Sequence, residues 1–325
     1  MHAHVLPARF PAYLPEPALP GWPSMADAHA CHRHVMIDGK IYRTVSDRCW
    51  DPALRLADLQ AMGLDLQVLS PMPELFSYWL PAPAANELLR YINDQIAEMV
   101  AASDGHLAGL GAVPLQDMDR ALAELHRVMT ELGFAGVEIG SNINGRPIGH
   151  PDFAPFFAQA AALNAAVFVH AVRPEMGRVI GPGPLQQALG YPSEIGLAAA
   201  SCITGQLMTR HPALRIAFSH GGGTLGLLLP RLEQACHVFP AIRDAVPTSP
   251  TAAARRMFYD SLVFDTATLR HLTGQFGDTQ IMLGTDYPFN FHDRTPVARV
   301  EEAFGDQAVR DRLTRGNASR FLGRA

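Results

Sequence analysis

Short runs of hydrophobic residues alternate along this chain with longer segments in which hydrophobic residues recur every three or four positions. The short runs predict strands buried on both faces, and the longer segments predict amphipathic helices. The predicted strands cover residues 66–70, 107–113, 136–140, 166–171, 215–220, 258–260 and 281–286, with a further strand around residues 2–4. The predicted helices cover residues 84–103, 118–132, 153–164, 194–209, 225–237, 266–275, 297–304 and 307–314.

Regular alternation of strand and helix is typical of a parallel sheet with helices packed outside it. Counting the N-terminal strand, the pattern contains eight βα units. We therefore predict an α/β fold, a (β/α)8 TIM barrel, in a single domain that spans residues 1–325.

A proline-rich segment at about residues 8–48 interrupts this pattern directly after the first strand. The segment shows no hydrophobic periodicity, so we predict that it is irregular. Loops that follow barrel strands lie on the catalytic face, and the insertion is therefore expected to cap the barrel mouth.

Composition and charge narrow the class of protein. The chain has 325 residues, of which 48% are hydrophobic, and a formal net charge of −5. No basic block is present, which argues against a nucleic-acid partner. No apolar run reaches the roughly 18 residues of a membrane span, and the N-terminus has no signal-peptide pattern. The four cysteines are scattered without a C-x-x-C pair, so we expect a cytoplasmic protein.

Lys40 is the only lysine in the chain. A Schiff base or a lysine nucleophile would depend on this one residue, in a segment predicted to be irregular. The composition therefore favours metal chemistry over lysine chemistry.

Four residues in or at the ends of predicted strands are of types that bind divalent metals. His2 and His4 are two positions apart on a strand, so their side chains point to the same face. His170 and Asp286 close two later strands, and the ends of barrel strands meet at the catalytic face. Three imidazoles and one carboxylate suit Zn²⁺, with Mn²⁺ or Fe²⁺ as alternatives. We predict one such ion, which as zinc would lower the pKa of a bound water to about 7.

His220 closes another predicted strand. A lone histidine on an apolar strand is most often a core residue with satisfied hydrogen bonds. Beside a metal site it could instead take and return a proton, because its reference pKa lies near neutrality. Glu138 on the predicted strand 136–140 could reach the barrel centre or be a buried polar partner, and we favour the second interpretation.

Other motifs give weaker support for a particular function. Gly221, Gly223 and Gly226 match a dinucleotide-binding fingerprint formally, but they follow His220 and do not lie in the first βαβ unit, so nucleotide binding is not expected. No G-x-S-x-G elbow supports a serine hydrolase. A cluster in the insertion could form a second, structural metal site, although a solvated or ligand-facing loop is the favoured interpretation. That cluster consists of His29, Cys31, His32 and His34.

Several longer motifs resemble the amidohydrolase superfamily, in the branch that contains 2-amino-3-carboxymuconate-6-semialdehyde decarboxylase and related aromatic-acid decarboxylases. The resemblance extends over nearly the whole chain. The matching stretches are Met1-His2-Ala3-His4, Trp50-Asp51-Pro52-Ala53-Leu54-Arg55, Val113-Pro114-Leu115-Gln116-Asp117, Val169-His170, Ser219-His220-Gly221-Gly222-Gly223, the segment from Met282 to Phe289, and Gly316-Asn317-Ala318-Ser319-Arg320-Phe321.

The resemblance implies a barrel with one catalytic metal per subunit, bound by the four residues named above, and His220 and Asp286 as catalytic residues. It implies that Arg43 holds a substrate carboxylate and that Arg231 reaches the neighbouring subunit's site in a homodimer. Two arginines suit a dicarboxylate, because each can form a bidentate pair. The alternative is that Arg43 is a loop residue and Arg231 forms a surface or dimer salt bridge. Arg173, where the family pattern differs, favours a different acidic substrate.

We therefore expect a metal-dependent, non-oxidative decarboxylase, a C–C lyase acting on a carboxymuconate semialdehyde or a close aromatic carboxylic acid. The alternative is a metal-dependent hydrolase of an amide, a lactone or a ring C–N bond. A non-catalytic barrel is a third hypothesis, which the full set of metal-ligand residues and His220 disfavours.

Overall fold

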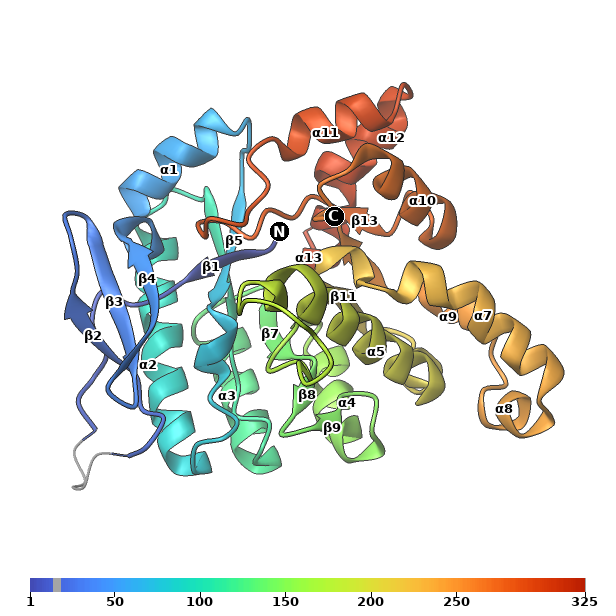
Figure 1. The fold of residues 1–325 in the computed structure, drawn as a ribbon, viewed down its shortest axis with the longest axis horizontal. Coiled ribbons are helices and arrows are strands. Elements are labelled where there is room, and N and C mark those ends of the chain that lie inside the picture. Colours follow the sequence, from blue (N-terminus) through green and yellow to red (C-terminus); the bar gives the residue numbers. More distant parts are fainter. Residues whose placement is uncertain (14–18, 325) are drawn as a thin grey trace.

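Eight parallel strands form one sheet in the computed structural model, which describes residues 1–13 and 19–324. The strand order is β1-β5-β6-β7-β10-β11-β12-β13, so each strand lies beside the next strand of the barrel along the chain (Figure 1). The strands are β1 (Ala3–Val5), β5 (Gln67–Pro71), β6 (Leu107–Gly111), β7 (Gly136–Gly140), β10 (Ala166–His170), β11 (Arg215–Phe218), β12 (Phe258–Asp260) and β13 (Ile281–Met282).

The first strand and the segment after the last strand close the sheet on itself. The His4 amide donates to the carbonyl oxygen of Tyr287 at 2.7 Å, and the Asp286 amide donates to the carbonyl oxygen of His2 at 2.8 Å. The strand predicted at 281–286 is thus regular only to Met282, and its remainder hydrogen-bonds to β1 as extended chain. The predicted TIM barrel is confirmed.

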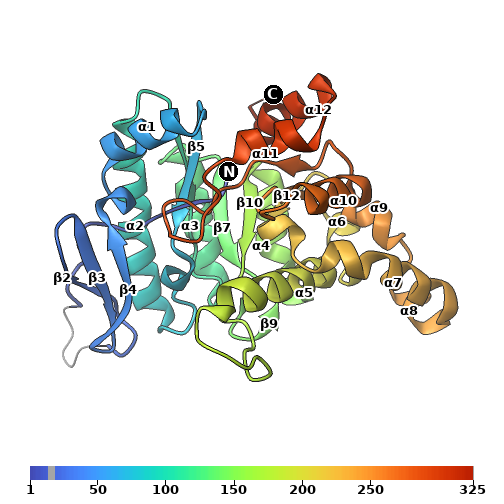
Figure 2. The ribbon, with the colours of Figure 1, turned by 45° about the horizontal axis from the view of Figure 1, so that its top comes forward.

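Helices surround the barrel in the spaces between successive strands (Figures 1 and 2). Acidic N-caps begin several of them, because the carboxylate accepts backbone N–H groups that the first turn leaves unpaired; Asp51, Asp117 and Asp265 do this. The helices are α1 (Pro52–Ala61), α2 (Ala82–Ala101), α3 (Met118–Thr130), α4 (Ala154–Ala162), α5 (Tyr191–Thr204), α6 (Leu207–Arg210), α7 (Leu225–Val238), α8 (Pro240–Ala245), α9 (Pro250–Ala254), α10 (Thr266–Phe276), α11 (Pro296–Ala303), α12 (Gln307–Asp311) and α13 (Asn317–Leu322).

The insertion at residues 8–48 is more regular than predicted. It contains a three-stranded antiparallel sheet of β2 (Ser24–Asp27), β3 (His32–Ile37) and β4 (Lys40–Ser46). Asp38 and Gly39, both at positive φ, connect β3 to β4, and Asp-Gly is a strong hairpin signal that the surrounding prolines obscured. The prediction of an irregular segment is wrong for these strands, and residues 14–18 lie outside the described residues. A smaller hairpin pairs β8 (Asn142–Ile143) with β9 (Arg146–Pro147).

The barrel interior has an apolar layer at one end and a polar layer at the other. Alternate strand residues point inward, so Phe168 and His170 share a face, as do Phe258 and Asp260. The apolar layer is one buried cluster, which the end of α13 covers with Phe321. The polar side chains that continue these inward rows therefore meet at the carboxyl ends of the strands.

No helix among the described residues is long and apolar enough to cross a membrane.

Candidate metal centre

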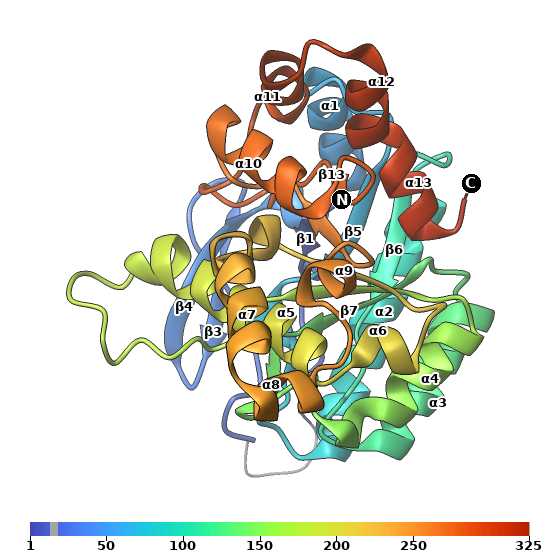
Figure 3. The same ribbon diagram turned by 90° about the vertical axis from the view of Figure 1, so that its right-hand side faces the viewer.

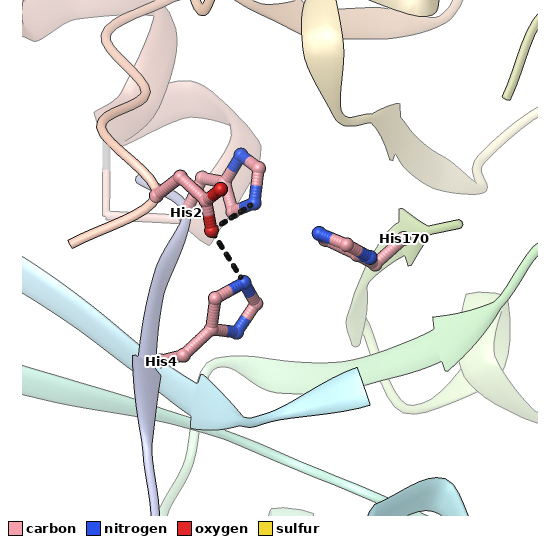
Figure 4. Close-up of side chains that lie close together, drawn as sticks. His2, His4 and His170 are labelled. Atoms are coloured by element: carbon pink, nitrogen blue, oxygen red, sulfur yellow. Dashed lines mark ion pairs between the residues drawn. The ribbon is translucent and has the colours of Figure 1, made fainter. Parts of the chain in front are cut away.

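Four side chains converge at the carboxyl end of the barrel. His2, His4, His170 and Asp286 each present one donor atom, and these four atoms all lie within 4.8 Å of one another. Figure 4 shows the three histidine side chains turned toward one another. The structure thus brings together the residues that the sequence predicted as metal ligands, although their segments are far apart along the chain.

Strand register places these ligands at one level of the barrel. His4 lies opposite Ser70, one residue before the end of β5. His170 is the last residue of β10 and lies opposite Gly140, the last residue of β7. Parallel strands in register bring their final inward side chains to the same height, so ligands at the ends of different strands can reach one ion.

Each imidazole has one nitrogen occupied and one free. Nδ1 of His2 donates to Oδ2 of Asp260 at 2.5 Å, and the Nδ1 atoms of His4 and His170 lie 3.2 Å and 2.8 Å from the carbonyl oxygens of Pro71 and Ala171. All three Nε2 atoms are buried with no hydrogen-bond partner among the described residues. Leaving three buried polar nitrogens unpaired is costly unless a cation binds there. The donor set therefore fits a divalent metal.

Asp286 supplies the negative charge of the cluster. Its Oδ1 atom lies 3.1 Å from Nε2 of His4 and 3.5 Å from Nε2 of His2. Burial acts to raise the pKa of Asp286, but the close imidazoles of His4 and His2 outweigh it, so the pKa is lowered and the carboxylate stays ionised. Positive φ angles at His2, Asp286 and His220 place strained backbone at this site, as is common in functional centres.

Asp260 is a site residue that the sequence analysis missed. It is fully buried at the end of β12, where its Oδ1 atom accepts the amide of Gly221 at 2.7 Å while Oδ2 holds His2. Burial opposes ionisation, yet the hydrogen bond from His2 lowers the pKa of Asp260 overall. The available signal was an acidic residue closing a predicted strand, which is the same signal that identified Asp286.

Glu138 is fully buried on β7, with both carboxylate oxygens unpaired in the described part of the chain. Its Oε2 atom lies 3.9 Å from Nδ1 of His4. Burial raises the pKa of Glu138 to about 7. Glu138 therefore faces the barrel centre, as the first interpretation of the sequence had it, and it is also a buried polar neighbour of the ligand His4.

His220 lies beside the four donors without joining them. Its ring centroid is 5.0 Å from that of His170 and 5.3 Å from that of His2, and Tyr191 stacks on it at 6.0 Å. Its Nδ1 atom is 3.0 Å from Oγ of Ser219. Burial, reinforced by the charge of His2, lowers the pKa of His220 to about 4, so the imidazole is neutral at pH 7 and can accept a proton.

A cavity of about 30 Å³ adjoins the metal ligands, and Arg43 is part of its wall. The Arg43 guanidinium lies over the ring of Phe289, 4.2 Å from its centroid. A larger cavity of about 670 Å³ shares Arg43 and Phe289 and extends toward His29 and His32. The sheet β2–β3–β4 therefore contributes directly to the walls beside the metal ligands.

Arg231 does not lie with the other predicted site residues. It is exposed on α7, which lies with α8 at the right-hand edge of the molecule in Figure 1 and on the side that faces the viewer in Figure 3. Its predicted substrate role stays a prediction, because one chain does not test a contribution to a neighbouring subunit.

Two other motifs have structural explanations. Gly223 has a φ of 57°, and a Cβ atom there would lie 1.9 Å from the carbonyl oxygen of Pro192, so this glycine permits close packing against α5. The histidine-rich part of the insertion forms no converging group of three donors among residues 1–13 and 19–324. The rings of His29 and His32 instead lie tilted against each other, with centroids 4.1 Å apart, beside the larger cavity.

Comparison with known proteins adds independent information. The family model described as Amidohydrolase matches residues 1–324. A 2-amino-3-carboxymuconate-6-semialdehyde decarboxylase of Dictyostelium discoideum is 34% identical over 330 residues, covering 99% of this chain and 90% of the relative.

Two solved structures share the fold. The IDCase of Metarhizium anisopliae in apo form has a TM-score of 0.83 at 21% identity, covering 99% of this chain and 96% of that chain. A dihydroxybenzoic acid decarboxylase from Polaromonas sp. JS666, with bound manganese and the inhibitor 2-nitroresorcinol, has a TM-score of 0.77 at 23% identity. That likeness covers 85% of this chain and 87% of the other.

Proposed function

This chain belongs to the amidohydrolase family, and we propose that it is a metal-dependent, non-oxidative decarboxylase of a carboxymuconate semialdehyde or an aromatic carboxylic acid. The observation that carries the proposal is the meeting of three unpaired Nε2 atoms and one carboxylate beside a neutral histidine and an arginine-lined cavity. The 34% identical decarboxylase supports the choice of reaction.

The metal would be held by His2, His4, His170 and Asp286, and it would supply a Lewis acid next to the substrate. We favour Zn²⁺ because of the three imidazole donors, with Mn²⁺ or Fe²⁺ as alternatives. The manganese bound in the Polaromonas structure supports Mn²⁺ as the alternative.

His220 would move the proton that the reaction requires. In a non-oxidative decarboxylation the C–C bond breaks, carbon dioxide leaves, and a proton takes the place of the carboxyl group on carbon. With Nδ1 of His220 next to Ser219, its Nε2 atom is free to carry that proton. Arg43 would hold a substrate carboxylate in the cavity, because its guanidinium is permanently charged and Phe289 fixes its position.

A homodimer would complete the site through Arg231. Leu227 and Arg231 lie four residues apart on one face of α7, and Leu227 is 75% exposed. Phe239, directly after α7, is 56% exposed, so the segment that carries the arginine also exposes apolar side chains. Such a patch suits a protein–protein contact. We further propose that β2–β3–β4 caps the active site and that the enzyme works in the cytoplasm, where its four cysteines stay free.

Product analysis tests the reaction. Metal-loaded enzyme incubated with carboxymuconate semialdehydes and hydroxybenzoates should release carbon dioxide, and His220→Ala should reduce turnover by at least about a hundredfold while retaining metal. Release of an amine or a carboxylic acid without carbon dioxide would support the hydrolase alternative. Unchanged turnover in the variant would refute the role of His220.

Mixed dimers test the shared site. Arg231→Ala and His220→Ala subunits should each be inactive alone, because each homodimer lacks one group in both sites. Mixing and reassembling them should restore activity, since one site in each mixed dimer then has both groups. Failure to recover any activity would contradict the contribution across the interface.

A further inference from the structure

An ion pair lies in the wall of the metal-lined cavity, at a place where neither residue has a role in the chemistry above. Glu74 belongs to the 3-10 helix η2 (Pro73–Phe76) directly after β5, and Arg173 follows the ligand His170 by three residues. Both side chains line the same cavity of about 30 Å³ as His4, His170 and Asp286. The pair is therefore within reach of any molecule bound at the metal.

The geometry of the pair fixes the carboxylate of Glu74. Nη2 of Arg173 donates to Oε1 of Glu74 at 2.8 Å, and the guanidinium also lies over the ring of Trp79. The Glu74 side chain is only 14% exposed, whereas that of Arg173 is 50% exposed. The stacked arginine thus acts as an anchor at the rim, and the carboxylate is the member of the pair that lies deeper in the cavity.

The second oxygen of Glu74 is available to a ligand. Oε2 has no hydrogen-bond partner in the described part of the chain. Burial raises the pKa of Glu74, while the positive charges of Arg173 and Arg43 oppose this. An ionised carboxylate accepts hydrogen bonds and donates none, so a ligand that displaces water from this oxygen can pair with it only through an O–H or N–H group.

A purely structural ion pair explains these facts less well. An ion pair with a half-exposed arginine contributes roughly 0–1 kcal/mol, which is small against the cost of burying most of a carboxylate in the cavity wall. Resting on the proposed function, we propose that Glu74 is a specificity-determining residue that accepts a hydrogen bond from a hydroxyl or amino substituent of the substrate acid.

The two cavities suggest how such a ligand lies. Arg43, Gln187 and Phe289 line both the small cavity and the larger cavity of about 670 Å³. The substituent would point toward Glu74 in the small cavity, and the rest of the molecule would extend past Phe289. A substrate carboxylate next to Glu74 would be repelled, so the carboxylates of the ligand are expected to lie toward Arg43 and away from Glu74.

Binding of matched probes tests the proposal without using turnover. Dissociation constants are measured by calorimetry on metal-loaded protein for benzoate, the three monohydroxybenzoates and 2-aminobenzoate. At least one substituted probe should bind the wild type about tenfold or more tightly than benzoate does, as expected for a hydrogen bond to a charged group. In Glu74→Met this advantage should fall to within about twofold, while benzoate binds at least as tightly as before.

Control variants separate this effect from general damage. Glu175→Gln removes a nearby carboxylate that binds the Gly177 amide outside the metal-lined cavity, and it should leave the advantage unchanged. Glu74→Gln keeps one acceptor oxygen and should keep part of the advantage even if Glu74→Met folds poorly. An undiminished advantage in both Glu74 variants, or a wild type that binds no substituted probe more tightly than benzoate, would overturn the proposal.

The outcomes also separate this inference from the proposed reaction. If the enzyme releases carbon dioxide but the Glu74 variants keep the binding advantage of the substituted probes, only the specificity role is refuted. A preference that depends on Glu74 in a protein that releases no carbon dioxide would refute only the decarboxylase.

Discussion

Replacing Asp260 by asparagine should weaken metal binding strongly, although Asp260 is not itself a proposed ligand. Its two oxygens have separate tasks: Oδ2 accepts Nδ1 of His2 at 2.5 Å, and Oδ1 accepts the amides of Gly221 at 2.7 Å and Leu262 at 3.1 Å. Asparagine has only one oxygen. Whichever way the amide turns, its NH₂ group faces an N–H group that formerly donated a hydrogen bond to the carboxylate.

The size of the effect follows from the contact with His2. A hydrogen bond to a charged group contributes about 1.5–3 kcal/mol, and every 1.4 kcal/mol is a factor of ten in binding. Loss of the carboxylate also removes the negative charge that keeps Nδ1 protonated and aims Nε2 at the metal. We therefore expect Asp260→Asn to bind Zn²⁺ about 10–100-fold more weakly, the usual consequence of removing such a supporting group.

Chelator competition measures this directly. Metal-free wild type, Asp260→Asn and Glu124→Gln are each titrated with Zn²⁺ against a chelator of known affinity, and their unfolding in urea is recorded separately. Glu124 is a matched control, because it is a buried carboxylate paired with Arg127 and Arg90 outside the barrel. The control should lose stability without losing zinc affinity. A zinc affinity of Asp260→Asn within twofold of wild type would refute the reasoning.

Three further predictions concern stability, measured by urea unfolding of metal-free protein. Burial raises the pKa of Glu138 from 4.5 to about 7, so the folded state binds an extra proton there. The stability of wild type relative to Glu138→Gln should therefore fall by about 3 kcal/mol as the pH rises through this window. A stability difference between the two proteins that does not change with pH would contradict this. Arg55→Met should cost about 2–4 kcal/mol, because the fully buried guanidinium donates to the His4 carbonyl and two other acceptors; a loss below about 1 kcal/mol would count against this. Gly136→Ala should destabilise the protein severely, since its Cβ would lie 1.9 Å from a backbone oxygen of β10. Gly274 on α10 has nothing within 4 Å of such a Cβ, so Gly274→Ala should stabilise the protein by up to about 1 kcal/mol. Equal effects of the two substitutions on stability would refute this reasoning.

Much of the barrel could be predicted because its strands are buried on both faces. The predicted strands 136–140 and 258–260 have the same bounds as β7 and β12. Continuous hydrophobic runs of this length are typical of buried strands, and the three-to-four-residue period of the helices distinguishes the helices from them. Prediction failed in the insertion, where a three-stranded sheet is only partly buried and its strands contain many polar residues.

The site was predictable only where a residue's type and its place at a strand end carried the information. His2, His4, His170, His220 and Asp286 met both conditions. Asp260 met them too, but a carboxylate that orients a histidine has no sequence signature that separates it from an ordinary strand-end aspartate. Glu74 is an acidic residue but is not at a strand end, because η2 is a short connection whose position depends on the strands around it.

The chain by itself determined that eight strands would alternate with helices and that metal-binding side chains would end several of them, because hydrophobic period and residue type are local properties. Only the tertiary structure decided which nitrogen of each imidazole is free, that Asp260 holds His2, and that Glu74 with Arg173 borders the same cavity. These relations join residues up to 258 positions apart, as His2 and Asp260 are. Such pairs meet only through the closure and register of the whole barrel, which no local pattern encodes.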